Sequence, residues 1–391
     1  MRDPTIALLA ELVSIDSVNP ALVPGGAGET EIADTVARVL SAAGMDVETV
    51  QAAPGRPNVV GVLEGKAPGR SLILCGHLDT VGVEEMAAPF DPVERDGRLY
   101  GRGSQDMKGG LAAILGAARE LASASLPGGR LIVAAVADEE HASLGADTLV
   151  KTWKADAAIV AEPTDLVVAV GHKGFSWVEI ETLGRAAHGS RPAEGEDAIL
   201  RMGRVLSRLE ALERELQGRS PHPLLGTASL HASLIEGGRE LSTYPDRCTL
   251  RLERRTVIGE SVDVALSEAE AILASLRKED PSFQAAARSL FGRPPYETPR
   301  GHPIIDALEA AMETVGRRPR RGGMTYWTDA AILGHAGIPS VVFGPGGEGL
   351  HGLEEYVCVD EVLACRAILA ETARRFCAGS ADRPRERAAQ A

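Results

Sequence analysis

Long hydrophobic runs and C-x-x-C cysteine pairs are missing from this sequence, and its first residues do not have the pattern of a signal peptide. No apolar run approaches the roughly 18 residues that a membrane-spanning helix requires. Residues 1–17 carry acidic side chains within an apolar stretch and lack a cleavage pattern, so they predict an amphipathic helix and not a signal peptide. The five cysteines are scattered without C-x-x-C spacing, which is typical of reduced thiols. We therefore expect a cytoplasmic protein that has no membrane partner.

Basic residues are fewer than acidic residues in this sequence. The chain has 41 Lys and Arg residues against 55 Asp and Glu residues, a formal net charge of −14. Nucleic-acid binding needs a basic face, so we expect no nucleic-acid partner. The pattern G-x-x-x-x-G-K-[ST] is absent from the Gly-rich segment 101–110, which disfavours a phosphate cradle there. No internal repeat is visible, and 391 residues are too many for one compact core, so we expect two domains.

The larger domain has the pattern of an α/β fold. Segments 71–76, 130–137 and 157–161 are apolar throughout, as expected for parallel strands covered on both faces. An Asp-Gly pair at 96–97 predicts a hairpin. Helices are predicted over 4–16 (capped by Asp3), 30–45 (capped by Thr30), 111–123, 302–316, 328–336 and 360–377, with a strand at 339–343. We expect a mixed sheet with helices on both faces, followed by a disordered tail over 379–391.

A different pattern begins after residue 173. Residues 175–182 alternate apolar and polar side chains, which is typical of an antiparallel strand with one exposed face, and we expect it to be an edge strand. It is followed by a predicted helix at 195–216, strands near 228–235 and 247–254, a helix at 261–277 and a strand near 283–289. The order β-α-β-β-α-β is the ferredoxin-like pattern. We therefore expect an inserted α+β domain over 174–290, which splits the larger domain into 1–173 and 291–378.

Acidic and imidazole side chains follow the apolar strands, at the positions where open α/β sheets place their sites. These side chains are His77, Asp79, Asp106, Glu139, Glu140, Glu162 and His351. Two imidazoles and several carboxylates that converge at one end of a sheet predict a metal site, and one with room for two metals.

Each of these groups, taken alone, has a plainer interpretation. His77 and Asp79 could be a polar pair in a turn, although a spacing of two puts both on one face of an extended segment. Asp106 could cap a helix, or it could bridge two metals through its two oxygens. Glu139 and Glu140 could form a solvated acidic turn, or one could bind metal while the other acts as a general base. Seven such groups in five segments leave the plainer interpretations little room.

Two further candidates lie in the expected inserted domain. His188 sits among small residues in AAHGSRP, and Arg255 ends a predicted strand in LRLERRTVIGE. Without other information, the surroundings of each indicate only a surface residue.

The order of the motifs resembles that of a known family. The chain contains H-L-D at 77–79, G-R-G-x-x-D-M-K-G-G at 101–110, D-E-E at 138–140, A-E-P-T at 161–164, G-x-x-A-H-G-S at 184–190 and G-P-G-G-x-x-x-H-x-x-x-E at 344–355. This set is similar to that of the dinuclear-zinc aminoacylase family, which includes acetylornithine deacetylase, succinyl-diaminopimelate desuccinylase, aminoacylase and glutamate carboxypeptidase. The similarity covers nearly the whole chain. It implies a zinc-exopeptidase-like α/β fold with an inserted ferredoxin-like lid domain through which two chains form a homodimer.

The resemblance also implies a role for the residues of the larger domain. His77, Asp106 and Glu162 would hold one zinc. Asp106, Glu140 and His351 would hold the other. Asp79 would orient His77, and Glu139 would be the general base.

The resemblance implies substrate contacts as well, and here the chain departs from the family pattern. His188 would reach the partner subunit's site and stabilise the oxyanion. Arg255 would contact the substrate carboxylate, in a D-x-R-x-x-P-G motif that has Ile258 in place of its Pro. Ser242 stands where the family often has Asn. Gly346 and Gly347 belong to the substrate-binding loop GPGGEGLH, with Gly347 where desuccinylases carry an amide side chain. These departures leave the acyl group and the amino acid open.

We therefore expect a metal-dependent amide hydrolase that cleaves N-acyl amino acids, N-acetyl ones first, with two divalent ions, zinc or cobalt. The alternative is a dipeptidase or glutamate-type carboxypeptidase with the same site. A protein that binds metal and amino-acid derivatives without turnover is disfavoured by the presence of Glu139.

Overall fold

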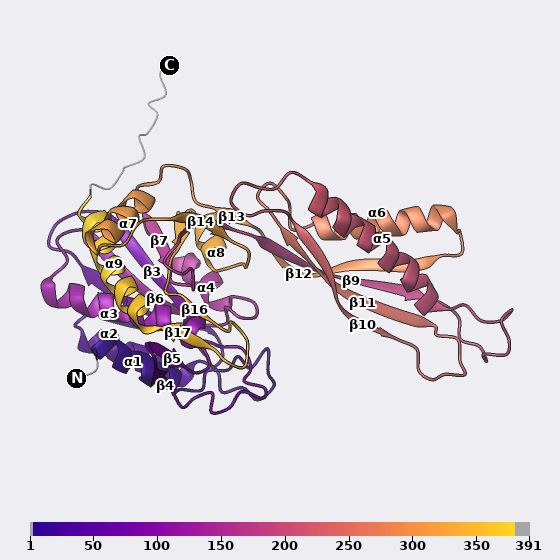
Figure 1. Cartoon of the computed structure of the whole chain (residues 1–391), viewed down its shortest axis with the longest axis horizontal. Coiled ribbons are helices and arrows are strands. Elements are labelled where there is room, and N and C mark those ends of the chain that lie inside the picture. Colours follow the sequence, from indigo (N-terminus) through magenta and orange to yellow (C-terminus); the bar gives the residue numbers. More distant parts are fainter. Residues whose placement is uncertain (1–2, 380–391) are drawn as a thin grey trace, which may run out of the picture. The chain divides into compact units, whose positions relative to one another are not determined.

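The structure, a computed structural model, describes residues 3–379. Within this range the chain forms two compact units (Figure 1). The first unit contains everything up to Val170, Thr298–Gly322 and everything from Thr328, and the second contains Gly171–Glu297 and Gly323–Trp327. The short return of 323–327 to the second unit was not indicated by any sequence pattern. Apart from Gly379, the expected tail lies outside the described residues.

The first unit is built on a mixed sheet whose strand order is β1-β2-β6-β3-β7-β15-β8. Its strands are β1 (Asp46–Ala53), β2 (Arg56–Glu64), β3 (Ser71–His77), β6 (Arg130–Val136), β7 (Ala157–Val160), β8 (Val168–His172) and β15 (Ser340–Val342), and the short strands β13 (Tyr296–Glu297) and β14 (Arg321–Met324) also pair with β8. The neighbours β6, β3, β7 and β15 run parallel, whereas β1, β2 and β8 are antiparallel to their neighbours. The apolar segments predicted as parallel strands are therefore β3, β6 and β7.

Helices cover both faces of this sheet (Figure 1). They are α1 (Pro4–Val13), α2 (Thr30–Ala42), α3 (Gly109–Ala124), α4 (Leu144–Thr152), α7 (Pro303–Thr314), α8 (Ala330–His335) and α9 (Val359–Ala378). Leu72 and Leu74 of β3 belong to a core shared with α1, α2, α3, α7 and α9. Ile73 and Cys75 alternate with them and are equally buried, on the face where α4 and α8 contact the sheet. Burial on both faces explains why these strands are apolar throughout.

Two helix starts were predicted with caps, and one of the two caps is wrong. Asp3 caps α1 as expected, since its side chain accepts a hydrogen bond from the Thr5 amide at 2.7 Å. Thr30 does not cap α2, because the residue at the N-cap is Glu29 and Thr30 is already helical. The side chain of Glu29 makes no cap hydrogen bond. It is turned instead toward Arg56, with which it forms a buried ion pair.

A small second sheet holds two loops of the first unit next to each other. It consists of β4 (Val93–Arg95), β5 (Arg98–Tyr100), β16 (Gly347–Glu348) and β17 (Tyr356–Cys358), in the order β16-β17-β5-β4. The predicted hairpin at Asp96–Gly97 is the β4–β5 turn, and both residues have positive φ, as a tight turn of this kind requires. Because β5 pairs with β17, the segment after Tyr100 and the segment before Tyr356 lie side by side.

The second unit has the expected ferredoxin-like order. Its elements are β9 (Gly174–Leu183), α5 (Ala198–Gly218), β10 (Ser229–Gly237), β11 (Arg247–Thr256), α6 (Val264–Glu279) and β12 (Gln284–Arg293), and its sheet order is β10-β11-β9-β12. The prediction of an edge strand at 175–182 is wrong, because β9 pairs with β11 on one side and with β12 on the other. One face of β9 is covered by α5 and α6. The alternation of apolar and polar side chains shows that one face of the strand is covered. It does not show whether the strand has a neighbour on each side.

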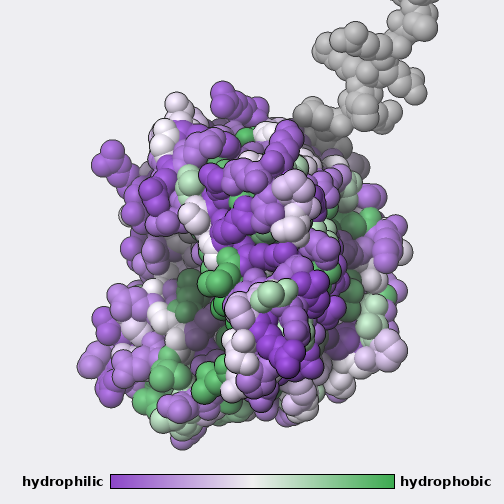
Figure 2. Space-filling view, turned by 90° about the vertical axis from the view of Figure 1, so that its right-hand side faces the viewer, coloured by the Kyte–Doolittle hydropathy of each residue, from purple (hydrophilic) through white to green (hydrophobic). Residues whose placement is uncertain are grey.

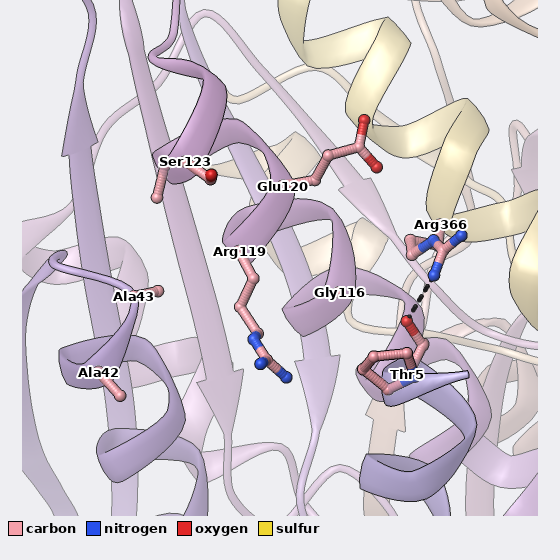
Figure 3. Close-up of a pocket in the computed structure, with 10 residues that line it drawn as sticks. Thr5, Ala42, Ala43, Gly116, Arg119, Glu120, Ser123 and Arg366 are labelled. Carbon is pink, nitrogen blue, oxygen red and sulfur yellow. Dashed lines mark hydrogen bonds between the residues drawn. The ribbon is translucent and has the colours of Figure 1, made fainter. Parts of the chain in front are cut away.

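A crevice of about 560 Å³ on the first unit lies between α1, α2, α3 and α9 (Figure 3). Arg366 of α9 crosses it to donate hydrogen bonds to Thr5 Oγ1 at 2.9 Å and to Asp3 Oδ1 at 3.0 Å. A Cβ atom on Gly116 would lie 2.9 Å from Cδ of Arg366, so glycine permits this crossing. None of the seven predicted site residues lines the crevice. We interpret it as the place where the start of α1 is fastened to α9.

No helix among residues 3–379 has both the length and the hydropathy that a membrane span would require.

Candidate metal centre

Three neighbouring parallel strands bring four of the predicted residues to one end of the sheet. His77 is the last residue of β3, Glu139 and Glu140 follow β6, and Glu162 follows β7. Because the strand order is β6-β3-β7 and all three run in the same direction, their carboxyl ends meet. The other two metal-site candidates come from loops. Asp106 lies in the turn Ser104–Lys108, and His351 lies between β16 and β17.

Asp106 stands between two groups of side chains. Its Oδ1 lies 3.0 Å from Nε2 of His77, which is itself 3.8 Å from Oε1 of Glu162. Its Oδ2 lies 3.4 Å from Nε2 of His351, which is 3.3 Å from Oε2 of Glu140. One carboxylate thus turns one oxygen to each group. This is the arrangement of a carboxylate that bridges two cations.

The site fits metal ions by the chemistry of its donors. His77 is fully buried, Glu140 and Glu162 are nearly so, and the His351 side chain is 53% exposed. Oε1 of Glu140 and Oε1 of Glu162 are buried without a hydrogen-bond partner among the described residues. A buried carboxylate oxygen that accepts no hydrogen bond is costly unless a cation faces it. His77 also belongs to two sets of donor atoms that lie within 4.8 Å of one another, one with Glu139 and Glu162 and one with Asp106 and Glu140.

Crowding of like charges shifts the pKa values of the whole cluster. Burial, and then the nearby Glu162, raise the pKa of Glu139 well above its usual value. Burial and Asp106 raise the pKa of Glu140 to about 7. Hydrogen bonds to Asp106 and Glu140 raise the pKa of His351 to about 10. Burial alone would raise the pKa of Asp106, but the two imidazoles beside it lower it. Without metal ions, bound protons therefore neutralise part of the negative charge of the carboxylates, which cations would otherwise neutralise.

Asp79 acts mainly on the turn that carries Glu139 and Glu140. Its Oδ1 accepts a hydrogen bond from the Glu139 amide and its Oδ2 from the Glu140 amide, each at 3.1 Å. Nδ1 of His77 lies 2.9 Å from the Asp79 carbonyl oxygen and 3.6 Å from the carboxylate. The backbone of Asp79 thus contacts the His77 ring, and its side chain fixes the acidic turn.

Glu355 fixes Asp106 in a similar way, and the sequence had given it no role. Its two oxygens accept hydrogen bonds from the amides of Gly103 (3.0 Å), Gln105 (2.9 Å) and Asp106 (3.1 Å), and from Nη1 of Arg102 (2.7 Å). Arg102 and Glu355 are both almost completely buried. The signal that could have found Glu355 was its place in the G-P-G-G-x-x-x-H-x-x-x-E segment; a buried Arg at 102 had no comparable signal.

The remaining candidates of the first unit, Gly346 and Gly347, are tightly packed. A Cβ atom on Gly346 would lie 2.0 Å from Oδ1 of Asp165, and one on Gly347 would lie 2.0 Å from the carbonyl oxygen of Tyr356. The Gly346 amide donates a hydrogen bond to Glu361 at 2.7 Å. Close packing is therefore sufficient to require glycine at both positions.

His188, Ser242 and Arg255 all lie in the second unit, but not together. The loop residues His188 and Ser242 are neighbours: the Gly189 amide donates to the Ser242 carbonyl at 2.7 Å, and both side chains are exposed. Arg255 lies on β11 opposite Phe175, which is at the start of β9, and its Nε donates to Glu253 at 2.6 Å. His188 follows the other end of β9. Leu183 follows Phe175 by eight residue steps of extended strand, roughly 26 Å at 3.3 Å per step.

The raised pKa values predict how the metal-free protein responds to pH. The folded-state pKa of Glu140 is about 7 and that of His351 about 10, and both exceed their unfolded values. Groups with a raised folded-state pKa stabilise the protein below the unfolded pKa, and this stabilisation is lost as pH rises through the folded one. The lowered pKa of Asp106 acts only at more acidic pH. We therefore expect the Tm of chelator-treated protein to fall between pH 5 and 8.

Added zinc should remove most of this fall in Tm, because the bound metal ions replace the protons that neutralise the carboxylates. The control is Glu140→Gln, which cannot titrate and should show a smaller fall. Thermal unfolding curves at fixed ionic strength measure both. A Tm that is constant or rises from pH 5 to 8 in the metal-free protein would contradict the interpretation of the cluster.

The proteins that this chain resembles include metal-dependent hydrolases, in agreement with the donor groups of the site. Residues 73–375 match Peptidase family M20/M25/M40. The chain is 33% identical to an acetylornithine deacetylase of Myxococcus xanthus, over 95% of this chain and 97% of the relative. It is 30% identical to the N-formyl-4-amino-5-aminomethyl-2-methylpyrimidine deformylase of Bacillus subtilis, over 96% and 95%.

A solved structure with a similar fold is the YXEP protein of Bacillus subtilis, described as a dinuclear metal binding peptidase from the M20 family. Its TM-score is 0.72 at 18% identity, and the match covers 95% of this chain and 97% of that one. The mixed α/β fold with a separate antiparallel sheet unit is confirmed by this likeness, and the resemblance read from the motifs is confirmed by the family match. The chain belongs to Peptidase family M20/M25/M40 and is a hydrolase.

Proposed function

We propose that the chain is an amide hydrolase that uses two divalent metal ions to remove the acyl group from N-acyl amino acids. The observation that carries the proposal is the position of Asp106, with Oδ1 at 3.0 Å from His77 and Oδ2 at 3.4 Å from His351. A carboxylate that faces an imidazole on each side suits a pair of cations that share it.

The proposed ligand sets follow from that arrangement. His77, Asp106 and Glu162 would hold one ion, and Asp106, Glu140 and His351 the other. Sites that combine imidazole and carboxylate suit zinc, or cobalt in its place. When bound, the ions would polarise the amide carbonyl and lower the pKa of the attacking water.

Glu139 is the proposed general base. One of its oxygens belongs to the set with His77 and Glu162 whose donor atoms lie within 4.8 Å of one another. Its raised pKa suits a group that must accept a proton and give it back. Glu139 would take the proton of the attacking water and return it to the leaving amine nitrogen. Asp79 would hold the Glu139 backbone during both transfers, through the hydrogen bond from the Glu139 amide.

The substrate class is supported by the relatives. Acetylornithine deacetylase and the N-formyl pyrimidine deformylase each remove a small acyl group from nitrogen, as their names state. Arg255 is suited to bind the carboxylate of an amino acid, because its Nε is held by Glu253 and its guanidinium stacks over Phe175 at 5.6 Å. A dipeptidase or glutamate-type carboxypeptidase with the same metal ligands is the second candidate, and the peptidase named above has this fold.

A homodimer would allow Arg255 and His188 to act at the same site although they lie far apart within one chain. Arg255 lies beside Phe175 at the start of β9 and His188 follows Leu183 at its end, and these two ends of β9 are roughly 26 Å apart. A small N-acyl amino acid is much shorter than that distance. We propose that Arg255 serves the site of its own chain, and that the partner's His188 stabilises the oxyanion there.

The outer strand β10 offers a surface for this dimer. Among residues 3–379 it pairs only with β11, and it carries exposed apolar side chains. Leu234 is 59% and Ile235 53% exposed, and Leu241 in the following loop is fully exposed. Figure 2, which views the molecule from the right-hand side of Figure 1, shows hydrophobic groups in green among the hydrophilic ones on this side. Pairing across a two-fold axis would cover Leu234, Ile235 and Leu241. We propose the cytoplasm as the location of this dimer, consistent with five free cysteines.

The roles of Glu139 and His77 can be separated by two substitutions. Glu139→Gln keeps the shape of the side chain and removes its proton acceptor, so kcat should fall by roughly 10²–10⁴-fold while about two metal ions remain bound. His77→Ala should lose at least one ion. Elemental analysis and steady-state kinetics of the two purified variants measure both. Loss of metal from Glu139→Gln would show that Glu139 is a ligand and that Glu140 must be reconsidered as the base.

A substrate panel decides between the two candidate functions. Zinc-reconstituted protein should hydrolyse at least one N-acetyl or N-formyl amino acid with a kcat/KM roughly tenfold or more above that of any dipeptide. The Glu139→Gln protein, prepared identically, controls for contaminating hydrolases. The opposite preference would replace the deacylase proposal with the dipeptidase one.

Mixed dimers test the shared site. His188→Ala and Glu139→Gln should each be inactive alone. In a hybrid, the chain with an intact Glu139 receives His188 of the partner subunit, so one site of two is complete. Random pairing of equal amounts makes half of the dimers hybrid, and activity should return to about one quarter of the wild-type value. If subunit exchange is demonstrated and no activity returns, or if a fully active monomer is found, the shared-site proposal is wrong.

A further inference from the structure

A buried set of polar side chains lies behind the candidate metal centre and takes no part in the proposed ligand sets. Its members are Glu29, Arg56, Asn19 and Asp138, with exposed fractions of 0%, 8%, 0% and 0%. They come from the start of α2, the start of β2, the loop after α1 and the turn after β6. Charged groups buried to this degree are costly unless each is paired, so their arrangement calls for a function or a compensating gain.

Asn19 connects this set to the metal centre. Its amide nitrogen donates to Oδ2 of Asp79 at 2.7 Å and to Oδ1 of Asp138 at 3.0 Å. Its amide oxygen accepts the Ala21 amide at 2.9 Å, which fixes which end of the side chain faces the carboxylates. Two carboxylates that would otherwise repel each other are thereby joined by one neutral group with two protons to donate.

Arg56 and Glu29 hold Asp138 from the other side. Arg56 donates from Nη2 to Oδ1 of Asp138 at 2.8 Å and binds Glu29 through Nε (2.6 Å) and Nη2. The Asp138 amide donates to Oε1 of Glu29 at 3.2 Å. The backbone of Asp138 has a positive φ of 69°. Its carbonyl oxygen accepts hydrogen bonds from the amides of Ala142 and Ser143, so Asp138 sets the shape of the turn that follows β6. Glu139 and Glu140 are the next two residues of that turn.

We propose that Asn19 is a positioning residue for the hydrolysis, which it serves by clamping Asp79 to Asp138. Asp79 holds the Glu139 and Glu140 amides, and Asp138 starts the same turn. The clamp therefore determines how far both glutamates stand from His77. Arg56 and Glu29 anchor the clamp in the first unit. The role in hydrolysis rests on the proposed function, whereas the hydrogen bonds of Asn19 are observed independently of it.

The alternative is that Asn19 only stabilises the fold, and the chain offers a matched control. Asn58 is also a buried Asn that supports the same turn: it donates to the Gly145 carbonyl at 2.8 Å and accepts the Ala137 amide at 3.0 Å. It bonds to neither Asp79 nor Asp138. Asn58→Ala and Asn19→Ala therefore both remove a buried amide and its hydrogen bonds, and only Asn19→Ala releases the two carboxylates.

The experiment measures three quantities on both variants. Zinc affinity is obtained by titrating the metal-free protein against a chromophoric chelator, kcat and KM are obtained on the zinc-loaded protein, and Tm is obtained by thermal unfolding. Both variants should have a lower Tm. Asn19→Ala should in addition lose roughly 10–100-fold in zinc affinity or in kcat, with KM within about twofold of wild type. Asn58→Ala should keep both within about twofold.

Several outcomes would overturn the proposal. If Asn19→Ala and Asn58→Ala differ from wild type only in Tm, Asn19 has a structural role alone. If Asn19→Ala does not fold, the milder Asn19→Ser, whose hydroxyl can serve one carboxylate at most, must show the same loss of zinc affinity or of kcat. If wild type hydrolyses no acyl amino acid or dipeptide, the proposed function fails. The zinc titration then still decides whether Asn19 organises the metal centre.

Discussion

Negative charge crowded at one end of the central sheet is the constraint on which the rest of the first unit depends. Asp106, Glu139, Glu140 and Glu162 lie within a few ångströms of His77, and burial removes the water that would screen them. The raised pKa values of Glu139, Glu140 and Glu162 reflect that cost. Two imidazoles are not enough to offset four carboxylates, which is why a pair of divalent cations is the natural complement.

Holding like charges together also requires anchors behind them. Glu355 collects three backbone amides and Arg102 to fix the turn that carries Asp106. Asp79 collects two backbone amides and Asn19 to fix the turn that carries the two glutamates. In both cases a buried carboxylate outside the proposed ligand sets accepts hydrogen bonds from main-chain N–H groups. The geometry of the site is thus set by backbone position, and less by the rotamers of the ligands.

Much of this could be predicted from the sequence, and the limits have physical causes. Apolar strands that end in His77 or are followed by Glu139 and Glu162 predicted both the parallel core and its site, because a strand buried on two faces leaves a clear pattern. Alternation in 175–182 predicted a strand correctly but placed it at an edge, since exposure of one face does not reveal the neighbours on either side. Glu355 was marked only by its place in a motif, and its partner Arg102 and the buried pair Arg56–Glu29 left no pattern. Charged residues are usually exposed, and only the tertiary structure brings these together.

The pairing of Glu355 with the Asp106 turn bears on how the site is made during synthesis. The Glu355–Asp106 hydrogen bond spans 249 residues of sequence, and the whole second unit is made in between. At the usual rate of chain elongation, roughly 5–20 residues per second, the Asp106 turn waits on the order of ten seconds or more for its anchor and for His351. Four of the five proposed ligands, His77, Asp106, Glu140 and Glu162, are therefore made before the second unit, and the fifth, His351, is made after it. Under the proposed ligand sets, tight capture of a second metal ion would require the finished chain, and a nascent chain would hold a partial and weaker site.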